Sequence, residues 1–203
     1  MKDGEEAPLG LRERKKQETR TALSWAVIRL SAERGWDNVT VQDAAAAANV
    51  CERTFRNYFS SKAEAVAARH LDRMLGVATE LRARPPGEPL WEAITSAVLS
   101  QFEGGQPPDP QWTDAIRLML AEPDLAGEVL KASAAAQHDL SAAVAERTGT
   151  DPARDLYPTL VAAAIGAAVG ASMDHWLRAD PPVSTGALIR EAFDRLRTGL
   201  PVP

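Results

Sequence analysis

Apolar residues recur at intervals of three and four along most of this 203-residue chain, the spacing that places them on one face of an α-helix. The first segment with this pattern has an apolar face made of Leu23, Ala26, Val27 and Leu30. Trp25 and Ile28 lie on another face, so we expect this helix to be covered on two sides. No segment alternates apolar and polar residues over enough positions to form a sheet. The pattern therefore predicts an all-α fold.

Glycine and proline residues divide the pattern into separate helices. Gly35, Pro123 and the proline pairs at 85–86 and 181–182 are all unfavourable inside a helix. They leave about nine segments, which we predict to be helices at residues 11–34, 41–48, 52–58, 61–83, 89–103, 111–120, 124–147, 153–178 and 185–198.

Two of these helices are short and close together. Residues 41–48 give about two helical turns, and residues 52–58 give about two more. Asn49 stands between them, and Asn tolerates the positive φ that a sharp turn requires. This spacing is typical of a helix-turn-helix motif, whose second helix projects outward.

Two hydroxyl residues mark where helices begin around this motif. Thr40 is followed three residues later by Asp43, and Ser61 is followed three residues later by Glu64. This is the spacing of a capping box, in which the hydroxyl and the acid each bind a backbone N–H group of the other. We therefore expect helices to begin just after Thr40 and just after Ser61.

From Leu11 to about His70, the chain resembles the tetracycline-repressor (TetR) family of bacterial transcription regulators. The resemblance consists of a basic lead-in at residues 11–20, then AERGWDNVTVQDAAAAANV, then ERTFRNYFSSKAEAV. Five residues occupy the family's habitual aromatic and phosphate-contact positions: Phe55, Tyr58, Phe59, Ser61 and Lys62. The resemblance implies a flexible tail at 1–10, a three-helix DNA-binding domain at 11–75, and a helical ligand-binding and dimerisation bundle at 76–203.

The sequence departs from the family pattern at four positions. Asn49 replaces the usual glycine of the turn, and Cys51 replaces the usual Ser or Thr cap. Ser31 stands where an aromatic residue is common, and Ala44 stands where isoleucine is common. We expect Cys51 to be a poor cap, because a thiol accepts hydrogen bonds weakly. The small side chains of Ser31 and Ala44 leave volume, and we expect Trp25 and Trp36 to fill it.

Nine polar residues are the candidate DNA contacts. Four of them face away from the apolar side of the second short helix: Glu52, Arg53, Arg56 and Asn57. Arg56 can bridge two acceptors of guanine, and Asn57 can bridge adenine. Arg53 could instead form an ion pair with a neighbouring acid. Glu52 could instead accept a hydrogen bond from a nearby arginine. The expected phosphate contacts are Thr40, Gln42, Thr54, Tyr58 and Lys62.

The C-terminal half carries a stripe of small residues at helical spacing: Ala163, Gly166, Ala167, Gly170 and Ala171. Such a stripe lets two helix backbones approach closely, so we expect a homodimer interface there. Packing inside the same chain remains the alternative.

Bulky or adaptable side chains of this half are candidate contacts for a small hydrophobic organic effector: Trp91, Phe102, Trp112, Arg117, Met119, His138 and Trp176. The run LMLAEPDL and the tryptophan of the penultimate helix resemble a subgroup that includes mycofactocin-type regulators. Some members of that subgroup sense acyl-CoA thioesters.

Charge is distributed unevenly along the chain. Residues 1–75 carry 13 Lys and Arg against 11 Asp and Glu, and residues 76–203 carry 10 against 17. DNA affinity depends on local cations and not on the total of −5, so the balance allows a double-stranded operator as partner.

The segment 156–173 has no charged residue, but it is rich in Ala and Gly and is bracketed by Asp155 and Asp174. We therefore predict a buried helix in a soluble, cytoplasmic protein and no membrane partner.

No catalytic motif stands out. The chain has no G-x-G-x-x-G, H-E-x-x-H or G-x-S-x-G sequence, and no Cys/His spacing that suits zinc. We predict no enzyme, cofactor or metal. The expected function is a ligand-responsive repressor that binds a near-palindromic operator as a dimer. The alternative is a constitutive helix-turn-helix protein that organises DNA or recruits partners without an effector.

Overall fold

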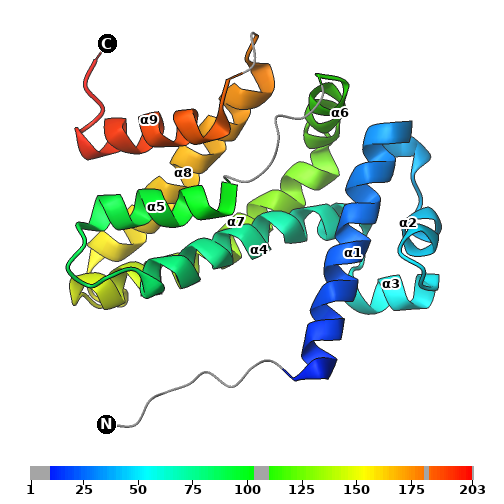
Figure 1. Ribbon diagram of the computed structural model, residues 1–203, viewed down its shortest axis with the longest axis horizontal. Coiled ribbons are helices and arrows are strands. Elements are labelled where there is room, and N and C mark those ends of the chain that lie inside the picture. The colour runs from blue at the N-terminus through cyan, green and yellow to red at the C-terminus, as the bar shows by residue number, and fades with distance from the viewer. Residues whose placement is uncertain (1–9, 103–109, 181–182, 203) are drawn as a thin grey trace. The chain divides into compact units, whose positions relative to one another are not determined.

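The computed structural model describes residues 10–102, 110–180 and 183–202, without the side chains of residues 110–113. Within these ranges it contains nine α-helices, a short 3-10 helix and no strand (Figure 1). The elements are α1 (Leu11–Arg34), η1 (Trp36–Asn38), α2 (Val41–Ala47), α3 (Glu52–Tyr58), α4 (Lys62–Ala83), α5 (Leu90–Phe102), α6 (Pro110–Leu120), α7 (Pro123–Thr148), α8 (Leu156–Arg178) and α9 (Thr185–Arg197). The all-α prediction is confirmed. The predicted tail lies outside the described residues except for Gly10.

The chain divides into two compact units, Met1–Arg69 and His70–Pro203. The division falls inside α4, so this one helix belongs to both units. The first unit holds α1, η1, α2 and α3, and the second holds α5 to α9. The functional boundaries at 11–75 and 76–203 stay a prediction.

The core of the first unit joins α1 to the two short helices. Leu23 and Val27 of α1 are fully buried, and so is Phe55 of α3. The rings of Phe55 and Phe59 meet edge to face with their centroids 5.7 Å apart, which adds to the stabilisation from burial alone.

Only one of the two tryptophans behaves as expected in this core. Trp36 is buried, but Trp25 is 46% exposed, and the guanidinium of Arg69 lies 5.3 Å from its ring. The prediction that Trp25 fills core volume is therefore wrong. Its indole lies beside the Arg69 guanidinium at the surface instead, a cation–π contact that stabilises a half-exposed ring.

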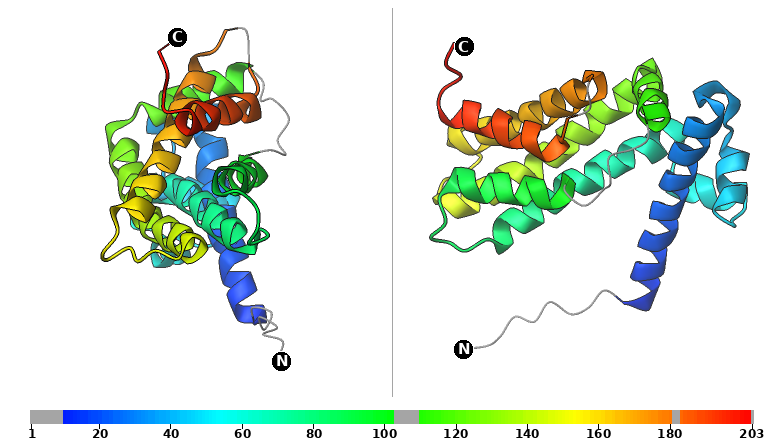
Figure 2. Two further views of the ribbon diagram at one scale, coloured as in Figure 1. Left: turned by 90° about the vertical axis from the view of Figure 1, so that its left-hand side faces the viewer. Right: turned by 45° about the horizontal axis from the view of Figure 1, so that its top comes forward.

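The core of the second unit is built mainly from five helices. α8 packs against α7 and α9, and α9 also packs against α5 (Figures 1 and 2). Five fully buried aliphatic side chains come from five different helices: Val77 of α4, Ile94 of α5, Val144 of α7, Ile165 of α8 and Ile189 of α9. This unit therefore has one continuous hydrophobic core.

The helix expected at 153–178 begins three residues later than predicted, at Leu156. The preceding residues form a turn, because the Asp155 carboxylate accepts from the Asp151 N–H (2.8 Å) and the Asp151 carboxylate accepts from the Ala153 N–H (2.9 Å). Asp side chains compete in this way with helical hydrogen bonding.

Of the described helices, α8 is long and apolar enough by length and composition to cross a membrane, with a mean hydropathy of 1.6. The core helix of a soluble protein passes the same test, and Val161, Ile165 and Val169 of α8 lie in the core of the second unit.

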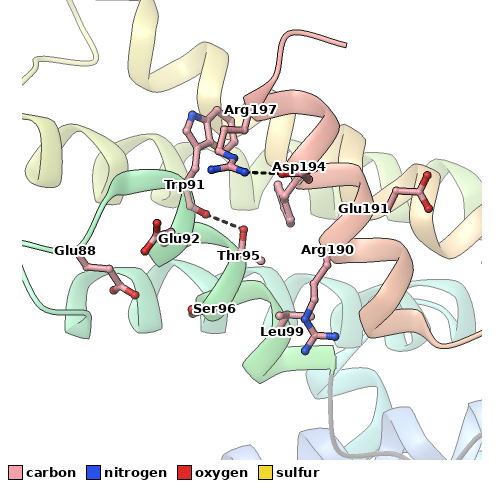
Figure 3. Close-up of a pocket in the computed structure, with 11 residues that line it drawn as sticks. Glu88, Trp91, Glu92, Thr95, Ser96, Leu99, Arg190, Glu191, Asp194 and Arg197 are labelled. Atoms are coloured by element: carbon pink, nitrogen blue, oxygen red, sulfur yellow. Dashed lines mark hydrogen bonds and ion pairs between the residues drawn. The ribbon is translucent and has the colours of Figure 1, made fainter. Parts of the chain in front are cut away.

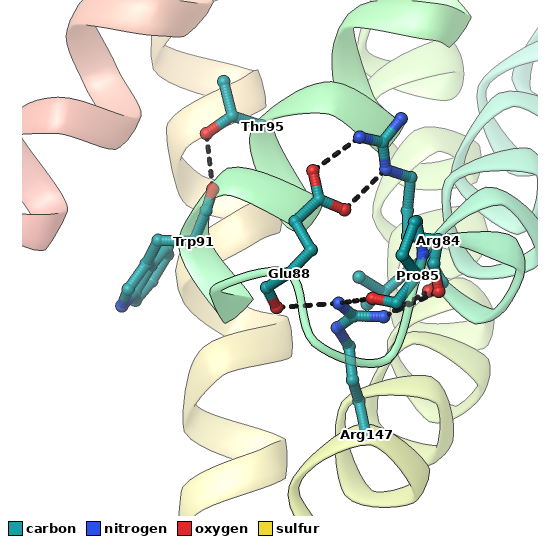
Figure 4. Close-up of polar contacts among 7 residues, drawn as sticks. Arg84, Pro85, Glu88, Trp91, Thr95 and Arg147 are labelled. Atoms are coloured by element: carbon teal, nitrogen blue, oxygen red, sulfur yellow. Dashed lines mark hydrogen bonds and ion pairs between the residues drawn. The ribbon is translucent and has the colours of Figure 1, made fainter.

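A single arginine holds the turn between α4 and α5 (Figure 4). The Arg147 guanidinium, from α7, donates to the backbone carbonyls of Arg84 (3.1 Å), Pro85 (2.6 Å) and Glu88 (2.8 Å). Beside it, the Arg84 guanidinium donates to the Glu88 carboxylate at 2.5 and 2.7 Å. Carbonyls at the end of a helix have no partner within the helix, so Arg147 replaces the partners that α4 itself cannot supply.

Candidate functional site

Two different caps position the helices of the helix-turn-helix motif. At α2 the Asp43 N–H donates to the Thr40 hydroxyl (3.1 Å), and the Thr40 N–H donates to the Asp43 carboxylate (2.9 Å). The capping box predicted here is therefore complete. The hydrogen bonds from the Thr40 side chain and backbone lower the pKa of Asp43, so the acid is ionised at neutral pH and the cap stays formed.

The capping box predicted at Ser61 is only half formed. The Glu64 N–H donates to the Ser61 hydroxyl at 3.0 Å, as expected. The Glu64 carboxylate, however, accepts from the N–H (2.7 Å) and the hydroxyl (2.6 Å) of Ser60 and not from Ser61. The reciprocal bond is displaced by one residue, because Ser60 offers this carboxylate two donors at once.

The turn and the second helix follow the sequence prediction closely. Asn49 has a φ of 55°, in the left-handed region. Cys51 is the N-cap residue of α3 and makes no side-chain cap hydrogen bond, as expected. Its thiol lies 3.3 Å from the Thr54 hydroxyl, and hydrogen bonding with Thr54 lowers the thiol pKa.

The outer face of α3 presents polar groups to solvent. Arg53, Arg56 and Asn57 are exposed, whereas Phe55 and Phe59 are buried beneath them. The buried rings fix the orientation of α3 on the first unit, so the polar groups are held on a rigid element. A short rigid helix with such a face is the geometry by which helix-turn-helix proteins reach base edges.

Glu52 connects two other candidate DNA contacts, Gln42 and Arg56. Its Oε2 accepts from Gln42 Nε2 at 2.7 Å, and its Oε1 accepts from Arg56 Nε (2.8 Å) and Nη2 (2.6 Å). The structure therefore contains the alternative in which Glu52 accepts hydrogen bonds from a neighbouring arginine, Arg56. Exposed pairs of this kind add little stability, but this one restrains the side chains of both Gln42 and Arg56.

The expected phosphate contacts have other roles as well. Lys62 Nζ donates to the carbonyls of Trp36 (2.5 Å) and Val39 (3.2 Å), and it lies 4.3 Å from the centre of the Trp36 ring. The Thr40 hydroxyl also donates to the Asp43 carboxylate at 2.5 Å. Tyr58 is partly buried, with its ring 6.4 Å from that of Phe59. The sequence pattern did not predict that Lys62 forms hydrogen bonds with the backbone of the segment before α2.

One hollow of the second unit is an open groove of about 850 Å³ between α5 and α9. Figure 3 shows Trp91, Thr95 and Leu99 of α5 across from Arg190 and Asp194 of α9. Its two acids on α9 are paired, Asp194 with Arg197 (2.7 Å) and Glu191 with Arg195 (2.8 Å). The groove is therefore polar along its α9 side.

Two further hollows border α7. One of about 550 Å³ is lined by His138, Ser141 and Thr159, among others. The other is a cavity of about 210 Å³ between α4, α7 and α8. In its wall, His70 Nε2 lies 2.9 Å from the Ser133 hydroxyl. His70 was not among the residues expected to contact an effector, and its only signal in the sequence is that it is a histidine within a long helix.

The expected effector contacts are spread over the second unit. Trp91 lines the α5–α9 groove, and His138 lines the 550 Å³ hollow. The Arg73 guanidinium lies over the Phe102 ring, 4.6 Å from the ring centroid. Arg117 pairs with Asp114 (2.9 Å) and also donates to the Leu177 carbonyl. Met119 is buried and Trp176 is partly buried. The side chain of Trp112 lies outside the described residues.

The small-residue stripe lies on the surface of α8. All five of its members, Ala163, Gly166, Ala167, Gly170 and Ala171, are exposed. Leu156 (75% exposed) and Leu160 (58% exposed) continue the same face toward the start of the helix. An exposed apolar face of this length indicates an interaction surface. We call these seven residues the α8 face. Among the described residues, no group of His, Cys, Asp and Glu could hold a metal ion.

Comparison with known proteins agrees with both units. A family model described as bacterial regulatory proteins of the tetR family matches residues 26–68, and one described as the MftR C-terminal domain matches residues 88–201. The transcriptional regulator TcmR of Streptomyces glaucescens is 31% identical, over 94% of this chain and 88% of its own. MftR of Mycobacterium tuberculosis is 27% identical, over 92% of this chain and 93% of its own.

A solved structure supports the same fold. FadR of Thermus thermophilus, described as a TetR-family transcriptional repressor in complex with lauroyl-CoA, has a TM-score of 0.55 and 20% identity, over 91% of this chain and 96% of its own. The C-terminal family model alone matches more than half of the chain. The resemblance seen in the helix-turn-helix residues is therefore confirmed: this chain belongs to the TetR family of DNA-binding transcriptional regulators.

Proposed function

We propose that this chain is a cytoplasmic repressor that binds a near-palindromic operator as a homodimer and is released by a small organic effector. The observation that carries the proposal is the outer face of α3, where Arg53, Arg56 and Asn57 are exposed above the buried Phe55 and Phe59. In a dimer, two such faces must lie about one DNA turn apart, ~34 Å, to enter successive major grooves.

The effector part of the proposal rests on the second unit. FadR of T. thermophilus, which has the same fold, binds lauroyl-CoA, and the described residues of the second unit form at least three hollows. A ligand changes operator affinity only if it binds one conformation of the dimer more tightly, and a typical coupling of ~1–3 kcal/mol changes affinity by roughly 5- to 150-fold. Because α4 belongs to both units, it is the element through which we expect this coupling to pass.

The experiment that tests the function is a nuclease-protection assay on the DNA that flanks the coding region of this protein, followed by a metabolite panel. Protection of a near-palindromic segment, lost on addition of one metabolite class, is the expected result. Protection that no metabolite alters favours the constitutive DNA-organising alternative. Absence of any protected segment contradicts both.

Arg56→Ala is expected to relax base preference. Arginine can bridge the O6 and N7 atoms of guanine, a contact worth about 1–3 kcal/mol of discrimination against other bases. The ratio of affinities for the protected segment and a scrambled one should therefore fall about 5- to 150-fold. Fluorescence anisotropy with both DNAs measures this, and Arg56→Lys is the matched control, since it keeps the charge and loses the two-pronged contact. Equal losses on both DNAs would exclude Arg56 from base reading.

Gly170→Ala is expected to weaken dimerisation without harming the fold. Apart from the adjacent residues and the backbone of α8 itself, no described residue has an atom within 4 Å of the position that a Cβ on Gly170 would occupy. Alanine also favours a helix interior over glycine by about 1 kcal/mol. The thermal stability of the monomer should therefore rise. On the α8 face, however, the added methyl group would separate two closely packed backbones.

Sedimentation analysis at a series of concentrations gives the dimer dissociation constant for this test. Gly127→Ala is the matched control, because Gly127 is an exposed glycine of α7 with equally open surroundings. For Gly170→Ala we expect the dimer dissociation constant to rise at least tenfold, which corresponds to ~1.4 kcal/mol. The same small change in both variants would place the interface elsewhere.

A further inference from the structure

The cavity of about 210 Å³ in the second unit differs from the other two hollows in its lining. Its wall is formed by His70 and Met74 of α4, Ser133 and Gln137 of α7, and the α8 segment 162–167. None of the residues that line it is Asp, Glu, Lys or Arg. A charged molecule would lose its hydration there without gaining an opposite charge, so the lining favours an uncharged occupant.

The polar groups of the wall are concentrated in one place. His70 Nε2 and the Ser133 hydroxyl are 2.9 Å apart, and Gln137 lies one helical turn after Ser133. Burial lowers the pKa of His70, and the charge of Arg73 adds to this, so the ring is neutral at neutral pH. The pair can therefore donate or accept one hydrogen bond, while Met74, Leu140 and Ala136 provide apolar contacts.

Three of the α8 residues in the wall also belong to the α8 face. Ala163, Gly166 and Ala167 line the cavity and are exposed at the surface. Apart from the adjacent residues and the backbone of α8 itself, no described residue has an atom within 4 Å of where a Cβ on Gly166 would be. On its α8 side the cavity is thus bordered by small side chains that are also exposed, and a second copy packed on the α8 face would cover them.

We propose that this cavity binds a small uncharged molecule with an apolar body and one hydrogen-bonding group, and that a second copy of the chain completes its wall. The inference rests on the proposed dimer through the α8 face. Occupancy and dimerisation are then linked, because a ligand that touches both copies binds the dimer more tightly than the monomer. The volume lies below the roughly 300–1,000 Å³ of sites for drug-sized ligands, which limits the occupant to about one ring.

This chemistry separates the cavity from the acyl-CoA ligands of some relatives. A coenzyme A thioester carries several phosphate charges, and the lining holds no cation to meet them.

Three probes of similar size and different charge test the proposal on the full chain: benzyl alcohol, benzylamine and benzoate. Ligand-detected NMR measures binding, and sedimentation measures the dimer dissociation constant. We expect benzyl alcohol to bind, the two charged probes to bind at least tenfold more weakly, and saturating benzyl alcohol to lower the dimer dissociation constant at least fivefold.

Ser133→Leu fills the cavity from the α7 side, away from the α8 face, and should abolish benzyl alcohol binding while the dimer still forms. Ala135→Leu, at an exposed neighbouring position of α7, should change neither property. Because Ser133→Leu could fail to fold, Ser133→Ala is the second variant, and the loss of one hydrogen-bonding group should weaken binding about fivefold.

The outcomes separate this inference from the function on which it rests. A chain that is monomeric without probe contradicts the proposed dimer, and the composite wall with it. A dimer that binds no benzyl alcohol, or binds it equally well after Ser133→Leu, overturns the cavity site but leaves the repressor proposal standing. Binding that leaves the dimer dissociation constant unchanged overturns the completion of the wall by the second copy.

Discussion

Replacement of Arg147 by methionine is expected to lower the free energy of unfolding of the second unit by about 3 kcal/mol. Methionine keeps much of the aliphatic length of the side chain but donates no hydrogen bond. The carbonyls of Arg84, Pro85 and Glu88, which now accept from this guanidinium at 2.6–3.1 Å, would lose their partner together. Hydrogen bonds from a charged donor contribute about 1.5–3 kcal/mol each, and partial rehydration of the exposed turn reduces the total.

Urea denaturation followed by tryptophan fluorescence measures this loss. Arg154→Met is the matched control, because Arg154 is 85% exposed and its ion pair with Asp151 spans 3.5 Å; we expect a change of less than about 0.5 kcal/mol there. Arg147→Lys should recover only part of the stability, since an ammonium group cannot reach three carbonyls in the planar arrangement of a guanidinium. A loss below about 1 kcal/mol for Arg147→Met would show that water replaces the arginine.

The Arg147 contacts also show what sequence patterns leave out. The helix ends on both sides of the 84–89 turn follow from its prolines and from the apolar periodicity, so the helices were predictable. The residue that holds the turn lies about 60 positions further along the chain, on α7. Local patterns carry no information about such a distant partner, and an arginine near a helix C-terminus is equally well explained by the helix dipole.

The same limit applies within the candidate DNA-binding face. Helical periodicity sorted the residues of α3 correctly, with Phe55 and Phe59 buried and Arg53, Arg56 and Asn57 exposed. The Gln42–Glu52–Arg56 contacts depend on the crossing of α2 and α3, which spacing alone does not determine. For Trp25, a tryptophan on an apolar stripe was expected to be buried, yet the cation of Arg69 makes a half-exposed position favourable.

The hollows of the second unit were the least predictable part. Seven bulky residues of the C-terminal half were candidates, but a hollow forms where side chains are small, not where they are large. The cavity beside His70 exists because Ala136, Ala162, Ala163 and Gly166 leave space between three helices. Small residues at helical spacing indicate close helix packing just as well. The sequence pattern therefore does not distinguish two helices in contact from a cavity between them.

Lys62→Met is expected to destabilise the first unit by about 2 kcal/mol and to weaken its binding to every DNA sequence by a similar factor. Lys62 Nζ donates to the carbonyls of Trp36 and Val39 and lies over the Trp36 ring. These carbonyls belong to the segment that leads into α2, so the loss of the donor leaves them without this partner and loosens the start of the helix-turn-helix motif. A cation in this place can also attract a phosphate, which adds to the loss on all sequences alike.

Two measurements on one variant separate these roles of Lys62. Thermal or urea unfolding reports the structural role, and the slope of log affinity against log salt concentration reports the phosphate contact, since each neutralised phosphate contributes about 0.9 to the slope. Lys16→Met is the control for the loss of a charge, because Lys16 is 62% exposed and pairs with Glu13 at 3.5 Å. A stability change as small as that of Lys16→Met would refute the structural role. A salt slope identical to that of the unaltered protein would remove Lys62 from the phosphate contacts, and the weaker binding would then follow from the loosened motif alone.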